Sequence, residues 1–148
     1  MRYEIISERN SKYHVKISSP SDAFKVLERF ASKRQEHFLV ITLDGAHQVE
    51  RAKIVSVGLV NRTVVHPREV FQPAIEDSAT AVIVAHNHPS GNVEPSTEDR
   101  DITEKLVSAG EILGIAVLDH VIIAKGGFYS FLEHGLLGTK GGEWYGND

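Results

Sequence analysis

The sequence of 148 residues contains no cysteine, and this absence excludes several kinds of chemistry at once. Disulfide bonds, iron–sulfur clusters, thiol nucleophiles and cysteine-based zinc fingers all require this side chain. The signature of the zinc deaminases is excluded as well, because those enzymes hold their metal with cysteine ligands. Any metal ion bound by this chain must therefore be held by histidine, aspartate or glutamate.

Long hydrophobic runs and an excess of positive charge are also missing. No apolar stretch approaches the roughly 20 residues of a transmembrane helix, and residues 1–8 lack the apolar segment of a signal peptide. We therefore expect a cytoplasmic protein without a membrane partner. The formal net charge of −4 argues against a general nucleic-acid-binding surface, which is usually basic. Hydrophobic residues at 41% and charged residues at 24% are typical of a globular domain.

The most informative segment follows an apolar run at residues 79–85, which predicts a buried strand. His86 and His88 come directly after it, and in an extended chain residues two apart point to the same face. A helix is predicted to begin near Ser96, which places Asp99 in its first turn. Two imidazoles and one carboxylate can then bind a single cation. Three protein ligands leave the fourth tetrahedral position to water, as in catalytic rather than structural zinc sites.

Ser96 and Asp99 also have a structural interpretation. Their spacing matches a capping box, in which the serine caps the helix and the acid reaches back to the cap. The two interpretations of Asp99 are nearly balanced on this spacing alone, and the neighbouring histidines favour a metal ligand. Ser96 can cap the helix and also donate its hydroxyl to an oxyanion. His120 interrupts a later apolar strand, either as a partner behind the metal ligands or as a hydrogen-bonded core residue.

A metallohydrolase also benefits from a carboxylate that moves protons. Six acids outside the third predicted helix are candidates: Glu36, Asp44, Glu50, Glu69, Glu76 and Asp77. Composition does not choose among them. Glu36 begins an apolar strand, where it suits the rim of a site, although an ordinary strand-edge charge is the simpler interpretation.

The remaining pattern predicts one α/β domain with a mixed sheet packed by helices. We expect helices at residues 22–33, 67–78 and 96–109, and strands at 36–43, 48–57, 79–85, 115–124 and 128–131. Pro73 falls inside the second helix, where a kink or an early break is expected because an interior proline costs about 3 kcal/mol. Gly110 is expected to close the third helix.

The spacing from His86 to Asp99, with His88 and Ser96 between them, resembles the JAMM motif of metalloproteases. With supporting segments at residues 35–38, 65–71 and 119–120, the chain is identified as a member of the RadC family of the JAB/MPN superfamily. The resemblance implies a JAB/MPN-like, cytidine-deaminase-like fold with a mixed, curved β-sheet sandwiched by helices. We expect an N-terminal extension at 1–19, the metallohydrolase domain at 20–137 and a flexible glycine-rich tail at 138–148.

The same resemblance implies roles for individual residues. His86, His88 and Asp99 would hold one zinc ion per chain. Glu36 would be the upstream acid and general base, and Ser96 the oxyanion donor. The implied activity is that of a zinc metallopeptidase or isopeptidase that acts on an amide bond of a peptide or protein.

Two alternatives to this activity stay open. One is a DNA-repair-associated protein that acts with or on nucleic acid, and the other is a non-catalytic scaffold. Full-length RadC-like proteins carry an N-terminal helix-hairpin-helix segment, a DNA-binding device that this chain is too short to hold. That difference, together with the acidic net charge, counts against the nucleic-acid alternative.

Overall fold

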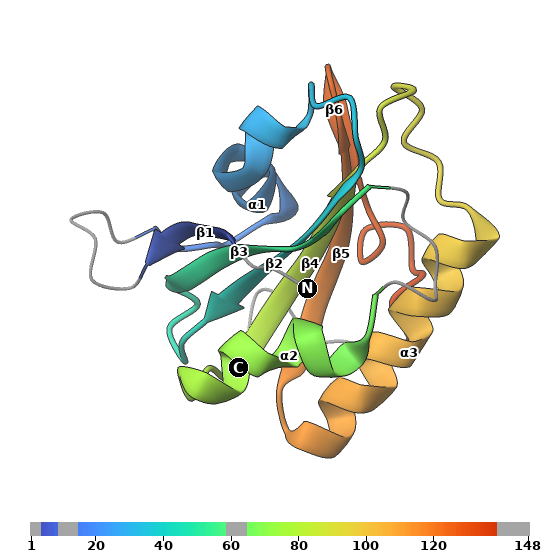
Figure 1. Ribbon diagram of the computed structural model, residues 1–148. Coiled ribbons are helices and arrows are strands. Elements are labelled where there is room, and N and C mark those ends of the chain that lie inside the picture. Colours follow the sequence, from blue (N-terminus) through green and yellow to red (C-terminus); the bar gives the residue numbers. More distant parts are fainter. Residues whose placement is uncertain (1–3, 9–14, 59–64, 139–148) are drawn as a thin grey trace.

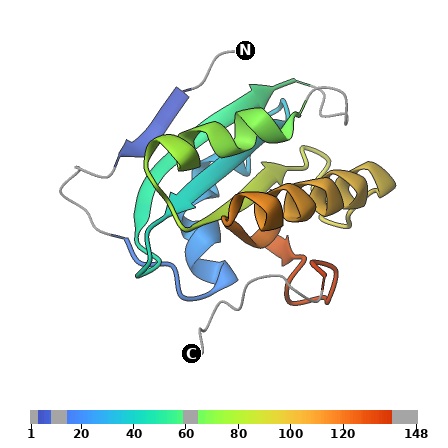
Figure 2. The same cartoon turned by 90° about the horizontal axis from the view of Figure 1, so that it is seen from below.

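The structure is a computed structural model that describes residues 4–8, 15–58 and 65–138. Its centre is a six-stranded mixed sheet with the strand order β1-β3-β2-β4-β5-β6. Helix α1 lies on one face of the sheet, and α2 and α3 lie on the other (Figures 1 and 2). This arrangement confirms the predicted α/β class with its JAB/MPN-like sheet between helices. No helix in the described part of the chain is both long and apolar enough to cross a membrane.

The described elements follow one another as a strand, a helical segment, a hairpin, two helix–strand units and a last short strand. The strands are β1 (Glu4–Glu8), β2 (His37–Leu43), β3 (Val49–Val57), β4 (Ala81–Asn87), β5 (Ala116–Ala124) and β6 (Gly127–Ser130). The helices are α1 (Pro20–Leu27), the short 3-10 helix η1 (Glu28–Phe30), α2 (Pro67–Glu76) and α3 (Thr97–Leu113). The expected tail at 138–148 lies, apart from Gly138, outside the described residues.

Strand β4 positions the functional segment because it lies inside the sheet. It pairs antiparallel with β2 and parallel with β5, and all seven of its residues are buried. Its side chains alternate between two cores: Ile83 and Ala85 pack with α1, whereas Val82 and Val84 pack with α2 and α3. The same alternation continues through the end of β4, so successive residues there reach opposite faces of the sheet.

Two predictions about the helices are wrong in detail. Helix α3 does not end at Gly110 but continues to Leu113, and Gly114 closes it with a left-handed φ of 74°. Gly110 lies inside the helix. Glycine is favoured at this position because a Cβ atom there would be only 2.4 Å from the carbonyl oxygen of Ile115. Helix α2 ends at Glu76 rather than at residue 78, so the expected early end is present but lies three residues after Pro73, and Asp77 N donates to the Pro73 carbonyl.

Candidate metal centre

The end of β4 and the first turn of α3 bring two imidazoles and one carboxylate together. His86 Nε2 lies 3.1 Å from Asp99 Oδ1, and His88 Nε2 lies 3.2 Å from Asp99 Oδ2. The two Nε2 atoms are 3.0 Å apart. Ligands of a tetrahedral zinc ion, each about 2.0–2.1 Å from the metal, are about 3.3 Å from one another. The two His–Asp distances end on different carboxylate oxygens, and with one donor atom from each residue all three donors lie within 4.8 Å of one another. Two imidazole nitrogens and a carboxylate oxygen this close suit a zinc ion, and the three side chains predicted from the sequence do form one cluster.

The capping box and the candidate ligand set share the same carboxylate. Ser96 N donates to Asp99 Oδ2 at 2.8 Å, and Asp99 N donates to Ser96 Oγ at 3.1 Å, so both bonds of the box are present. The structural interpretation of this pair is therefore correct, and it does not compete with metal binding. The cap orients the carboxylate toward the histidines. It uses Ser96 Oγ as an acceptor, and the hydroxyl proton is a separate donor.

The partners behind His86 assign its tautomer. Thr103 Oγ1 donates to the Asp99 carbonyl oxygen at 2.7 Å, so its only proton is used there and it must accept from His120 Nδ1, 2.5 Å away. A neutral His120 then carries its proton on Nδ1 and accepts at Nε2, which lies 2.9 Å from His86 Nδ1. Consequently His86 donates through Nδ1 and keeps a lone pair on Nε2, the nitrogen that faces Asp99.

His88 reaches the same arrangement through a loop carbonyl. Its Nδ1 lies 2.7 Å from the Asn92 carbonyl oxygen, which can only accept, so Nδ1 carries a proton. Nε2 is then free of that proton and points at Asp99. When neutral, each histidine therefore carries its lone pair on Nε2 and directs it to the same point, which is the form in which imidazole binds a metal.

Electrostatics at the cluster follow from its burial and its internal bonds. Burial alone would raise the pKa of the Asp99 carboxyl, but in the absence of a metal ion the hydrogen bonds that an Nε2 proton of His86 or His88 makes to the carboxylate outweigh burial and hold that pKa well below its usual range. Burial would lower the pKa of His88, yet the contacts with Asp99 and the Asn92 carbonyl leave it raised. Burial holds the pKa of His120 well below its usual value, which keeps this imidazole neutral.

His120 is also held in place by contacts other than those with His86 and Thr103. The ring of Phe131 stacks on it with centroids 4.6 Å apart. The preceding residue, Asp119, is fully buried and accepts from Ser130 Oγ at 2.6 Å, from His120 N at 2.7 Å and from Leu132 N at 3.0 Å. Both interpretations of His120 weighed from the sequence therefore apply, since it is a hydrogen-bonded core residue and also the partner of His86.

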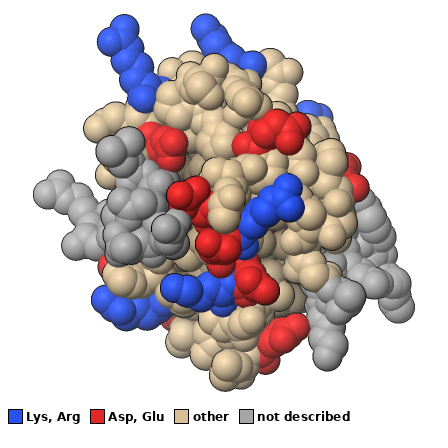
Figure 3. Space-filling model, turned by 90° about the vertical axis from the view of Figure 1, so that its right-hand side faces the viewer, with Lys and Arg blue, Asp and Glu red and all other residues tan. Residues whose placement is uncertain are grey.

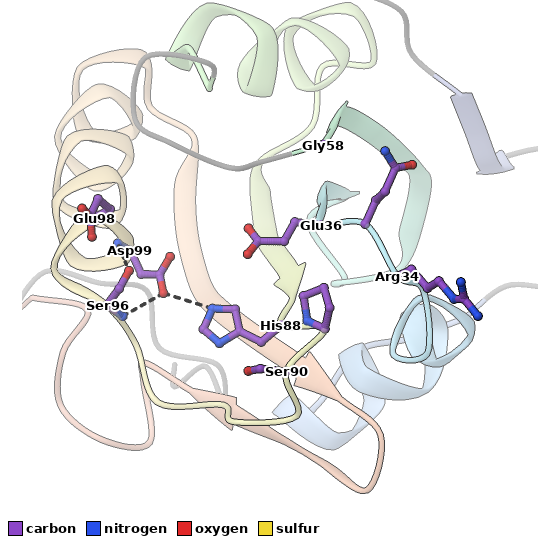
Figure 4. Close-up of a pocket in the computed structure, with 10 residues that line it drawn as sticks. Arg34, Glu36, Gly58, His88, Ser90, Ser96, Glu98 and Asp99 are labelled. Atoms are coloured by element: carbon purple, nitrogen blue, oxygen red, sulfur yellow. Dashed lines mark hydrogen bonds and ion pairs between the residues drawn. The ribbon is translucent and has the colours of Figure 1, made fainter.

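A pocket of about 620 Å³ opens beside the cluster. Its lining residues are Arg34, Gln35, Glu36, Gly58, His88, Pro89, Ser90, Ser96, Glu98 and Asp99. Figure 4 shows the Glu36 carboxylate extending into the space between its own loop and the His88–Asp99 pair, whereas Arg34 points away. Glu36 is also close enough to His88 to contribute to the raised pKa of that imidazole. Ser96 and Glu36 therefore border the same space from opposite sides.

The other five candidate acids are described by the structure, and none of them lines this pocket. Asp44 accepts from Ala46 N and Gln48 N in the turn between β2 and β3. Asp77 pairs with Arg51 at 2.5 Å. The structure thus distinguishes Glu36 from these acids, which composition did not.

Sequence reasoning missed two residues at this site, Asn87 and Thr103. Thr103 lies one helical turn after Asp99, a spacing that puts its hydroxyl next to the Asp99 carbonyl. Asn87 lies between the two histidines, and the alternation of a strand already indicates that it faces the opposite side. Both signals were present in the sequence, but only the fold shows which segments these side chains meet.

The chain matches the family model described as RadC-like JAB domain over residues 17–136. A UPF0758 protein of Rubrobacter xylanophilus is 52% identical over 122 residues, which are 82% of this chain and 53% of that protein. A UPF0758 protein of Geobacter sulfurreducens is 46% identical over 138 residues, covering 93% of this chain and 60% of its own length. The chain therefore spans little more than half the length of these curated relatives.

Proposed function

Because the chain belongs to the RadC-like JAB domain family, we propose that it is a zinc-dependent hydrolase of amide bonds, of the metallopeptidase or isopeptidase type. The observation that carries the proposal is the convergence of His86, His88 and Asp99 beside a pocket that Glu36 enters from the other side. One zinc ion per chain suits this donor set of two nitrogens and one carboxylate. When bound, such an ion polarises a carbonyl and makes water acidic enough to react near neutral pH.

The residues around the pocket have distinct roles in this mechanism. Glu36 accepts a proton from the attacking water and then donates it to the leaving amine. The Ser96 hydroxyl donates to the oxygen that gains negative charge as the carbonyl is attacked. Thr103 and His120 keep the His86 lone pair directed at the cluster, and the carboxylate of Asp99 is oriented by the helix cap.

The proposed substrate is a peptide or protein rather than nucleic acid. Neutralising a phosphate backbone requires clustered lysine and arginine side chains. The net charge is −4, and acidic side chains lie among the basic ones on the face seen in Figure 3. The pocket itself contributes three acids, Glu36, Glu98 and Asp99, against one arginine.

Glu36→Gln tests the proposal because it removes the base and leaves the three candidate ligands unchanged. We expect zinc content close to one ion per chain and a fall in kcat of about 10²–10⁴-fold on the peptide or isopeptide-linked substrates that the protein cleaves. Glu98→Gln is the matched control: it removes the same charge from the rim of the same pocket and should leave kcat within threefold.

Three outcomes would count against the hydrolase. The first is a His86→Ala variant that retains the full zinc content of the unmodified protein. The second is equal turnover by Glu36→Gln and the unmodified protein, which would favour a non-catalytic scaffold. The third is binding to DNA that weakens steeply with salt, combined with no cleavage of any peptide or isopeptide substrate.

A further inference from the structure

We propose that Asn87 is a positioning residue that fixes Glu36 relative to the metal site. This inference rests on the proposed function, because it assigns Glu36 the role of general base. The observation that suggests it is that three consecutive residues point their side chains to two different sides of the sheet. His86 and His88 face the pocket side of the sheet, whereas the side chain of Asn87 is completely buried between them on the opposite side.

The Asn87 side chain bonds to the segment that carries Glu36, between η1 and β2. Its Oδ1 accepts from His37 N at 2.6 Å, and its Nδ2 donates to the Gln35 carbonyl at 3.0 Å and to the Lys33 carbonyl at 3.3 Å. One amide thus holds backbone groups on both sides of Glu36. Both the oxygen and the nitrogen of this amide bond to a segment that lies some fifty positions earlier in the chain.

The backbone of Glu36 itself is bonded by the residue that follows β3. Gly58 N donates to the Glu36 carbonyl at 2.8 Å. The backbone around the catalytic acid is therefore tied to β4 in two ways, through the Asn87 side chain and through the β2–β4 pairing that places Phe38 opposite His86, and the Asn87 bonds are the ones that flank Glu36 itself. Because Asn87 is covalently joined to His86 and His88, any shift of the ligands along β4 moves the Glu36 segment with them.

The side-chain amide of Asn87 is unexpected at this position, because the other side chains on the same face of β4 are apolar. Ile83 and Ala85 precede it on that face and pack in the core beneath α1. Burying an amide in such a place is unfavourable unless its groups are hydrogen-bonded. Here the amide satisfies three backbone groups, two just before β2 and one on its first residue, and an apolar side chain would leave them without these partners.

The test is a double-mutant cycle between Asn87→Leu and Glu36→Gln. Leucine has a similar volume and no polar atoms, so it removes all three bonds. We expect the zinc Kd, measured by competition with a chromophoric chelator, to stay within threefold of the unmodified protein. We expect kcat to fall at least tenfold, since small misplacements of a catalytic group cost up to about 100-fold.

The second arm of the cycle separates positioning from a general structural role. In the Glu36→Gln background, Asn87→Leu should lower kcat less than threefold, because the group that it positions is already gone. Thr42→Val is the matched control: Thr42 is also buried, and its Oγ1 accepts from Arg51 N at 3.0 Å in the same sheet, outside the pocket lining. It should leave both kcat and zinc Kd within threefold.

The proposal is overturned if Asn87→Leu lowers kcat equally in both backgrounds, or if it weakens zinc binding as much as it lowers kcat. Should the leucine variant fail to fold, Asn87→Ser takes its place in the same cycle with the same criteria. If the unmodified protein cleaves no substrate, the proposed function fails, and hydrogen exchange decides on Asn87. The amide of His37 should then exchange at least tenfold faster in the Asn87 variant and unchanged in Thr42→Val, and equal exchange would overturn the proposal.

Discussion

Replacing Thr103 by valine removes one buried hydroxyl and should weaken both folding and zinc binding. Valine keeps the shape of threonine, so the core volume barely changes. The lost hydroxyl leaves the His120 Nδ1 proton without its acceptor, which lies 2.5 Å away in the structure. An unsatisfied buried donor costs about 1–3 kcal/mol, and we expect the free energy of unfolding of the metal-free protein to fall by that amount.

The effect on the metal follows from the same chain of hydrogen bonds. Without Thr103 Oγ1 as an acceptor, the tautomer of His120 with its proton on Nε2 becomes more favourable. That proton then points at the Nδ1 proton of His86, and the hydrogen bond between the two rings is lost. The His86 lone pair is no longer fixed on the nitrogen that faces Asp99. Loss of such a partner typically costs about 10–100-fold in metal affinity, and we expect the zinc Kd to rise by that factor.

Thr103→Ser is the matched control because it keeps the hydroxyl and removes only a methyl group. Burial of one methyl is worth about 0.8 kcal/mol, so the serine variant should lose about that much stability. Its zinc Kd should remain within threefold of the unmodified protein. Urea unfolding of the metal-free proteins and chelator competition measure the two quantities. Equal losses of zinc affinity in the serine and valine variants would refute the reasoning.

Two further predictions concern stability. Burial raises the pKa of Asp119 to about 6, above the value of about 3.9 for an unfolded chain, so the folded protein binds the extra proton between these values. The contribution of Asp119 to the free energy of unfolding is therefore complete below pH 4 and lost as the pH rises through 6. Between these values the unmodified protein should lose about 3 kcal/mol of unfolding free energy relative to Asp119→Asn. A difference between the two proteins that does not change with pH would contradict the assignment. Gly110→Ala should destabilise by about 1–3 kcal/mol although alanine favours helices, because its Cβ would lie 2.4 Å from the Ile115 carbonyl oxygen; a rise in Tm in thermal unfolding would show the contact to be unimportant.

The strand–helix arrangement was largely predictable because its signals are local. The apolar run at 79–85 identified the β4 region, and the His-x-His spacing with Asp99 predicted the cluster that the structure forms. Spacing alone sufficed here, since a strand places residues two apart on one face and a helix start fixes its first turn. The end of α3 was missed because a glycine has two meanings that sequence does not separate. Gly110 permits close packing against β5, whereas Gly114 supplies the left-handed turn.

The supporting contacts were beyond local reasoning because each joins distant segments. Thr103 meets His120 across 17 positions, and Asn87 meets the residues around Glu36 across about 50. The composition of these segments does not indicate either contact. The first arises from the packing of α3 on β5, and the second from the antiparallel pairing of β4 with β2. For the same reason Glu36 could be assigned a role only through the family resemblance, and the structure adds that it enters the pocket beside His88.

Because Asp99 both closes the helix and faces the histidines, a substitution at this position can remove one of these roles and keep the other. An asparagine at this position would still offer an oxygen to the Ser96 amide, so the first turn of α3 would remain closed, but it would bring no negative charge to the histidines. A single substitution can thus remove the proposed metal centre while the architecture survives. A relative carrying that change would keep the fold of this chain and differ from it, at this centre, in one atom of one side chain.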